Sequence, residues 1–196
     1  MQRLTVEDIE KYKDQYDLVP ICTEVYADVV TPILLLRKIA RAKERYYLLE
    51  SIEGGEKWGR YSFLGYDPIL RVYCDTSGVS ISGKSEGYIP VDGDMNAPSA
   101  RYKVTVDERG QKRVYTTDDS LSVLRDILNG YRAPKIEDAP PFAGGFVGYF
   151  SYAMLEHAEP VLDIKRGLSH DFDLMLYDKV IAYDHLKQKI VIVVNV

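Results

Sequence analysis

The sequence predicts an α+β fold with antiparallel, sandwich-like β-sheets and helices packed outside them. Three observations lead to this prediction. Short apolar segments alternate with turn residues such as Asp67-Pro68 and Ser77-Gly78, and connections this short join antiparallel strands. Other segments show the three-to-four-residue apolar spacing of amphipathic helices. Hydrophobic residues make up 46% of the 196 residues, enough to build a core.

The N-terminal segment carries helix signals. Thr5 and Asp8 have the spacing of a capping box, so a helix is expected through Tyr16. Residues 18–27 are extended and apolar, and Thr31-Pro32 then supplies the cap and first residue of a second helix. Four cations occupy the surface of that helix: Arg37, Lys38, Arg41 and Lys43. A solvated face explains them more simply than an acidic partner does.

A run of strands follows the second helix. We expect a meander of four strands, over residues 46–51, 60–66, 71–75 and 79–82. A polar loop covers residues 83–100. A hairpin then turns at Glu108-Arg109-Gly110, between strands at 102–106 and 113–117.

The C-terminal part begins with a helix that Asp119 caps and Asn129-Gly130 ends. A linker with three prolines follows. Glycines within residues 142–150 then indicate a bulge or a close approach of another backbone. Two long strands, at 174–184 and 189–196, complete the prediction. Because the last strand is so apolar, we expect it to need a further partner, and we expect exposed sheet edges or self-association.

Composition excludes several classes of function. The net charge of −5, without a block of Lys and Arg, disfavours nucleic-acid binding. No apolar run approaches the roughly 20 residues of a membrane helix, and the acidic N-terminus does not suit a signal peptide. Cys22 and Cys74 match no metal or redox spacing, which favours a reducing cytoplasm. The three histidines lack ligand spacing and no serine-nucleophile motif is present, so no catalytic or metal-binding residue is assigned.

One polar constellation suits a small ligand. Apolar Leu48-Leu49 leads to Glu50 and Ser51 at a strand end, and a second strand begins at Arg60 after a glycine loop. An acceptor, a hydroxyl and a cation around one small volume fit a zwitterion such as a free amino acid. The alternative is an ordinary hairpin with a polar tip.

Three ordered motifs resemble the N-terminal region of anthranilate synthase component I, within the wider family of chorismate-using enzymes. They are residues 48–51 (LLES), 59–65 (GRYSFLG) and 141–149 (PFAGGFVGY). The resemblance runs from about residue 28 to the end, apart from residues 85–117. Ala153 and Glu156 depart from the family pattern, which has Asp and Arg there. Residues 1–196 would then be a truncated N-terminal domain that lacks the chorismate-binding catalytic domain.

The resemblance implies a function for the intact enzyme. That enzyme is a lyase of tryptophan biosynthesis that converts chorismate to anthranilate, requires Mg²⁺ and receives ammonia from a glutamine amidotransferase subunit. The LLES element belongs to its feedback site for L-tryptophan. Carried over, the tryptophan-binding residues are Leu49, Glu50 and Ser51, with Arg60, Tyr61 and Ser62 as weaker candidates. Leu49 would pack against the indole ring, and the Glu50 carboxylate would accept a hydrogen bond from the ammonium group.

Other interpretations stay open. The chain without its C-terminal half is expected to be inactive, with no cofactor of its own. It could instead be a fragment of aminodeoxychorismate synthase component I, or a stand-alone amino-acid-binding module without catalysis. A structural docking domain for the amidotransferase is a further possibility.

Overall fold

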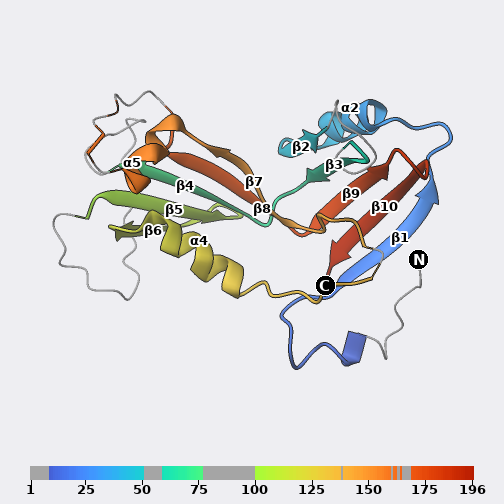
Figure 1. Ribbon diagram of the computed structural model, residues 1–196, viewed down its shortest axis with the longest axis horizontal. Coiled ribbons are helices and arrows are strands. Elements are labelled where there is room, and N and C mark those ends of the chain that lie inside the picture. Colours follow the sequence, from blue (N-terminus) through green and yellow to red (C-terminus); the bar gives the residue numbers. More distant parts are fainter. Residues whose placement is uncertain are drawn as a thin grey trace. The chain divides into compact units, whose positions relative to one another are not determined.

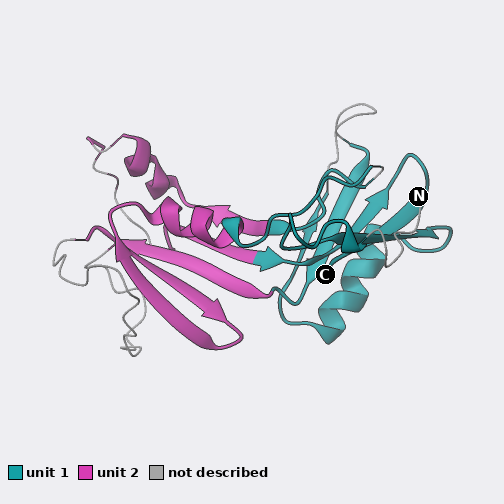
Figure 2. Cartoon of the chain, turned by 90° about the horizontal axis from the view of Figure 1, so that it is seen from below, with its two compact units in different colours: residues 1–68, 129–145, 176–196 teal, residues 69–128, 146–175 magenta. Residues whose placement is uncertain are grey.

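The chain folds into two compact units, each built on a five-stranded sheet (Figures 1 and 2). The computed structural model describes residues 9–50, 59–76, 100–137, 139–159, 161–162, 164 and 169–196. Unit 1 comprises residues 1–68, 129–145 and 176–196, and unit 2 comprises residues 69–128 and 146–175. Antiparallel pairing in both sheets, together with short helices, confirms the predicted α+β class.

Sheet A, in unit 1, has the strand order β1-β10-β9-β3-β2. Its strands are β1 (Pro20–Tyr26), β2 (Tyr46–Leu49), β3 (Tyr61–Tyr66), β9 (Lys179–Asp184) and β10 (Lys189–Asn195). The apolar β10 pairs with β1 on one side and β9 on the other. The strand that was expected to need a further partner therefore already has two.

The two faces of sheet A have separate cores. Because side chains alternate along a strand, one face buries Val180, Ala182, Val191 and Val193 under the segment around Phe142. The other face buries Tyr183 and Ile190 against Leu35 of α2 (Pro32–Ala42). Helix α2 begins as predicted, with Pro32 at its first position and the Thr31 hydroxyl accepting from the Leu34 N–H at 3.3 Å.

Sheet B, in unit 2 apart from the ends of β7 and β8, has the order β6-β5-β4-β8-β7. Its strands are β4 (Leu70–Thr76), β5 (Tyr102–Glu108), β6 (Gln111–Thr117), β7 (Gly145–Phe150) and β8 (Phe172–Tyr177). The predicted β5–β6 hairpin is confirmed: Arg109 and Gly110 form its two-residue loop, both with positive φ. Helix α4 (Ser120–Asn129) is capped by Asp119 Oδ1, which accepts from the N–H groups of Leu121 and Ser122.

The short helical segment before β8 contains the two family departures. It comprises the 3₁₀ turn η1 (Tyr152–Met154) and α5 (Leu155–Ala158). Glu156 is 6% exposed, pairs with Arg101 at 3.3 Å and accepts from the Ile164 N–H at 2.8 Å. Glu156 therefore has specific partners in unit 2 in place of the missing family pair.

Gly148 confirms the predicted close approach of two backbones. A Cβ atom there would lie 2.0 Å from the Asp173 carbonyl oxygen and 2.9 Å from the Leu174 Cα. No side chain fits in that space, so β7 and β8 depend on glycine at this position.

Three sequence predictions are wrong. The meander does not form, because β3 pairs with β2 and β9 whereas β4 pairs with β5. Residues 174–184 are not one strand but split at Asp178 into β8 of sheet B and β9 of sheet A. The first helix does not reach Tyr16, since residues 11–15 form turns. The capping box at Thr5 and Asp8 and the strand at residues 79–82 lie outside the described residues.

Asn195 holds the end of β10 beside that split. Its side-chain amide donates to the carbonyls of Ala143 at 2.8 Å and Asp178 at 2.9 Å, and its backbone N–H also donates to the Asp178 carbonyl. Gly144 lies against the same amide, which a Cβ atom would approach to 2.8 Å. The Asn195 side chain thus joins β10 to the residue between β8 and β9 and to the segment that leads into β7.

Candidate functional site

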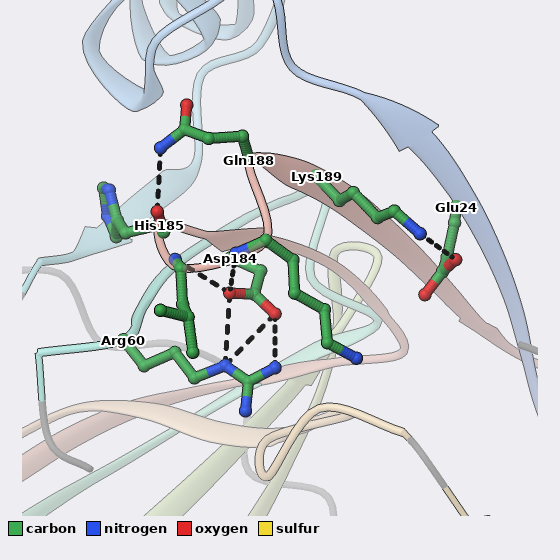
Figure 3. A network of polar contacts seen from close by, with 8 residues as sticks. Glu24, Arg60, Asp184, His185, Gln188 and Lys189 are labelled. Atoms are coloured by element: carbon green, nitrogen blue, oxygen red, sulfur yellow. Dashed lines mark hydrogen bonds and ion pairs between the residues drawn. The ribbon is translucent and has the colours of Figure 1, made fainter. Parts of the chain in front are cut away.

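Polar side chains gather at one end of sheet A. Because neighbouring strands are antiparallel, the C-terminal ends of β1, β2 and β9 meet the N-terminal ends of β3 and β10 there. This strand-end site carries Glu24, Arg60, Asp184, His185 and Lys189 (Figure 3), together with Glu50 and Ser62. Two of the sequence-predicted residues have partners at the end of β9 and in the turn after it: Arg60 pairs with Asp184, and Ser62 with His185.

Arg60 and Asp184 form the central ion pair of the strand-end site. Arg60 Nη2 donates to Asp184 Oδ2 at 2.6 Å, and Nε lies 3.1 Å from each carboxylate oxygen (Figure 3). The carboxylate side chain is 4% exposed, whereas that of Arg60 is 26% exposed. Asp184 Oδ1 also accepts from the backbone N–H groups of Leu186 and Lys187, at 3.0 Å each. One carboxylate therefore joins β3 to the β9–β10 turn.

The charges of this pair are mutually stabilised. Burial acts to raise the pKa of Asp184, but the hydrogen bonds from Arg60 and from the Lys187 N–H outweigh it and hold that pKa below its usual value. The hydrogen bond to Asp184 raises the pKa of the Arg60 guanidinium. Both groups are charged at neutral pH.

The Ser62 side chain lies on the face of sheet A opposite Tyr61 and Phe63, and its partner is a histidine. Its side chain is fully buried, and its Oγ lies 2.8 Å from His185 Nε2. The His185 backbone N–H donates to the Arg60 carbonyl, and its carbonyl accepts from the Gln188 amide at 2.7 Å (Figure 3). Ser62 is thus held in place from within the chain, on the α2 side of sheet A.

An apolar surface lies beside the ion pair. Tyr61 stacks on Phe63 with ring centroids 5.7 Å apart, and the Arg60 guanidinium lies 4.9 Å from the Tyr61 ring centroid. Leu49 pairs with Phe63 across the β2–β3 ladder and is 46% exposed. Leu49, Tyr61 and Phe63 therefore share one face, and Leu49 is accessible.

Glu50 follows the last paired residue of β2. It is exposed and has no ion-pair partner among the described residues. Ser51 lies outside the described residues. The structure therefore places Leu49, Arg60 and Tyr61 on or beside one face and Ser62 on the opposite one, and Glu50 directly after the end of β2.

Sequence reasoning missed Asp184 and His185 as members of this site. Asp184-His185 stands directly after an apolar strand, as Glu50 does, and this shared pattern of polar residues at a strand end is the signal that could have found them. On the far side of β10, Lys189 Nζ lies 3.1 Å from Glu24 Oε2 (Figure 3). That contact lowers the pKa of Glu24 and raises that of Lys189.

Within the described ranges, no group of three or more His, Cys, Asp or Glu side chains could hold a metal ion. The Mg²⁺ that the resemblance implies for the intact enzyme thus has no candidate ligand set in this part of the chain. No helix among the described residues is long and apolar enough to cross a membrane.

Several known proteins similar to the chain are named anthranilate synthase component 1. No protein-family model matches the chain. Anthranilate synthase component 1 of Acetivibrio thermocellus is 32% identical over 194 residues, covering 97% of this chain. The Aquifex aeolicus (strain VF5) protein of that name is 33% identical over 195 residues, and the Pseudomonas aeruginosa protein is 32% identical over 183 residues.

The match covers nearly all of this chain but a minor part of each relative. The chain spans 34% of the length of the first two relatives and 32% of the third. A solved structure of anthranilate synthase component I from Streptococcus pneumoniae TIGR4 aligns with 85% of this chain and 30% of that one, at 20% identity and a TM-score of 0.41. That score is too low to support the fold assignment, which rests on the strands and helices described above. By sequence, the chain is a relative of anthranilate synthase component 1, of which it spans about one third.

Proposed function

We propose that the chain is the tryptophan-responsive N-terminal part of an anthranilate synthase component I. The observation that carries this proposal is the 32–33% identity to proteins of that name over 97–98% of the chain. In the complete enzyme, chorismate would be converted to anthranilate by a C-terminal domain, with ammonia supplied by a glutamine amidotransferase. The 196-residue chain by itself would be inactive.

The strand-end site of sheet A offers the groups that a free aromatic amino acid requires. Glu50 is an exposed carboxylate without an ion-pair partner among the described residues, so it is available to accept from an ammonium group. Leu49 presents an exposed apolar side chain beside Phe63, which suits the indole ring. The Ser51 hydroxyl would donate to the effector carboxylate.

Arg60 and Ser62 have a different role in this proposal. Both side chains already bond within the chain, to Asp184 and to His185. We therefore assign them as positioning residues, which fix the start of β3 next to the end of β2. Tyr61 supports the apolar face through its stacking on Phe63.

The test measures feedback inhibition in the complete enzyme assembled with its amidotransferase. Glu50→Gln and Ser51→Leu are each expected to raise the L-tryptophan concentration for half-inhibition by at least about ten-fold, because each removes a contact to a charged group. Glu44→Gln is the matched control, since Glu44 is an exposed glutamate just before β2, at the opposite end of that strand. Unchanged inhibition in both site variants would remove the site assignment.

A product assay separates the two branches of the chorismate-using family. Anthranilate is the expected product of the complete enzyme with chorismate and an ammonia source. Formation of aminodeoxychorismate instead would show that the activity named for the relatives is not that of this protein. Tight binding of L-tryptophan to the 196-residue chain in calorimetry, without either activity in the complete protein, would favour a stand-alone binding module.

A further inference from the structure

Helix α2 presents an outward face that nothing in the proposed function uses. Residues of an α-helix advance by about 100° each, so the five positions 33, 34, 37, 38 and 41 lie on one side. The opposite side packs on β2 and β3, with Pro32 buried and Leu35, Leu36, Ile39 and Lys43 partly buried. The outward residues, which we call the α2 stripe, are Ile33, Leu34, Arg37, Lys38 and Arg41.

The cations of the α2 stripe differ from the nine Lys and Arg side chains that form ion pairs within the described part of the chain. Elsewhere, Lys and Arg side chains commonly pair with a carboxylate, as in Lys43–Asp67, Arg60–Asp184, Arg71–Asp173, Arg101–Glu156, Arg113–Glu108, Arg125–Asp119, Arg132–Asp17, Lys179–Asp178 and Lys189–Glu24. Among the described residues, none pairs with Arg37, Lys38 or Arg41. Helix α2 itself contains no acidic residue. Three positive charges thus stand together on the surface of a chain whose net charge is −5.

Apolar side chains extend the same stripe. Ile33 and Leu34 are each 43% exposed in the first turn of the helix. Solvated helix faces normally carry polar residues at such positions. Arginine beside exposed aliphatic side chains is instead typical of protein–protein interfaces, where the apolar contact excludes water from the ion pairs.

We propose that the α2 stripe docks an acidic segment of a partner protein. Residues one helical turn apart, such as Arg37 and Arg41, have Cβ atoms about 6 Å from one another. The fitting segment therefore carries two or three carboxylates at that spacing, followed by an apolar residue that meets Ile33 and Leu34. From Ile33 to Arg41 the stripe is about 12 Å long, which suits a small, reversible and salt-sensitive interface.

The same observations favour a protein over a nucleic acid. A polyphosphate gains affinity from many clustered cations, and the acidic chain as a whole repels it. Ile33 and Leu34 would also have no role against a phosphate backbone. An acidic protein segment uses both the charged and the apolar parts of the stripe.

The experiment measures binding of a labelled acidic peptide to the 196-residue chain by fluorescence anisotropy. The probe is a helical peptide of roughly 16 residues with Glu at every fourth position and leucine at one end. The stripe variant carries Arg37→Glu, Lys38→Glu and Arg41→Glu. The matched control carries Lys13→Glu, Lys103→Glu and Lys135→Glu, which change the net charge equally at exposed positions elsewhere. Circular dichroism checks that both variants fold, and a milder triple change to Gln replaces the stripe variant if it does not.

The stripe variant is expected to weaken peptide binding by at least about ten-fold and the control by less than about two-fold. Leu34→Ser is expected to weaken it by a few-fold without changing the charge. No binding by the unaltered chain, or equal losses in the two triple variants, would overturn the proposal. Binding of a duplex DNA as tight as that of the peptide, and insensitive to Leu34→Ser, would overturn it in favour of a polyanion site.

Discussion

Replacing Asp184 with asparagine isolates the charge at the centre of the strand-end site. Asparagine has nearly the same shape, and its side-chain oxygen still accepts from the backbone N–H groups of Leu186 and Lys187. What the substitution removes is the negative charge that faces the Arg60 guanidinium. The change in unfolding free energy therefore reports the ion pair and not the turn.

The expected loss follows from the exposure of the two partners. A hydrogen bond to a charged group contributes about 1.5–3 kcal/mol. Breaking a fully buried pair costs about 3–5 kcal/mol, but Arg60 is 26% exposed and water solvates it once Asp184 is gone. We expect Asp184→Asn to lower the free energy of unfolding by about 2–3 kcal/mol.

Urea unfolding at pH 7, followed by circular dichroism, measures this loss. Glu108→Gln is the control, because the Glu108–Arg113 pair has the same chemistry but both side chains are about half exposed. Such exposed pairs contribute about 0.2–1 kcal/mol. An Asp184→Asn loss no larger than that of Glu108→Gln would refute the strength assigned to the Arg60–Asp184 pair.

Acid titration provides an independent check of the same pair. The pKa of Asp184 is lower in the folded chain than in the unfolded one. Its contribution is therefore fully present above the unfolded pKa of about 4 and is lost as the pH falls through the folded value. The stability difference between the unaltered chain and Asp184→Asn is expected to shrink over that acid range. A difference that stays constant down to the acid transition would contradict the assigned cause.

Three further predictions concern stability, each measured by urea unfolding. Gly148→Ala is expected to cost at least about 3 kcal/mol, because its Cβ would overlap the Asp173 carbonyl; a loss below about 1 kcal/mol would show that β7 shifts freely. Tyr47→Phe is expected to leave stability unchanged or raise it by about 1 kcal/mol, because the buried Tyr47 hydroxyl has no hydrogen-bond partner among the described residues. A clear loss would reveal a bound water there. Thr31→Ala is expected to cost about 1 kcal/mol through the lost cap on α2, and Thr31→Ser much less.

Features with local causes could be predicted from the sequence. Helix α2 starts at Thr31-Pro32, where the capping hydrogen bond joins residues only three positions apart. The β5–β6 turn forms at Arg109-Gly110 because of the backbone conformations of these two residues. The partners of β3 could not be predicted in this way, since they depend on strands far away in the chain. The interruption at Asp178 could not be predicted either: residues 174–184 have the composition of one strand, but they form strands of two different sheets.

The candidate site shows the same difference between local features and contacts with distant residues. The sequence predicts Arg60 as a site residue together with Glu50 and Ser51, but its ion-pair partner, Asp184, lies 124 residues further along the chain. Ser62 was grouped with its neighbours in sequence, but strand alternation turns it to the opposite face, towards His185. The residue types were predictable, whereas their partners and directions required the fold.

The position of β10 next to the edge strand β1 has a consequence for the order of events during synthesis. Strand β1 is at the edge of sheet A, and its ladder partner is β10, which emerges from the ribosome roughly 160 residues later. At about 5–20 residues per second, this leaves β1 without its partner for about 8–30 s. During that interval the nascent polypeptide exposes an unpaired edge, which makes chaperone engagement during translation more important for unit 1 than for the β5–β6 hairpin, whose strands are neighbours in the chain.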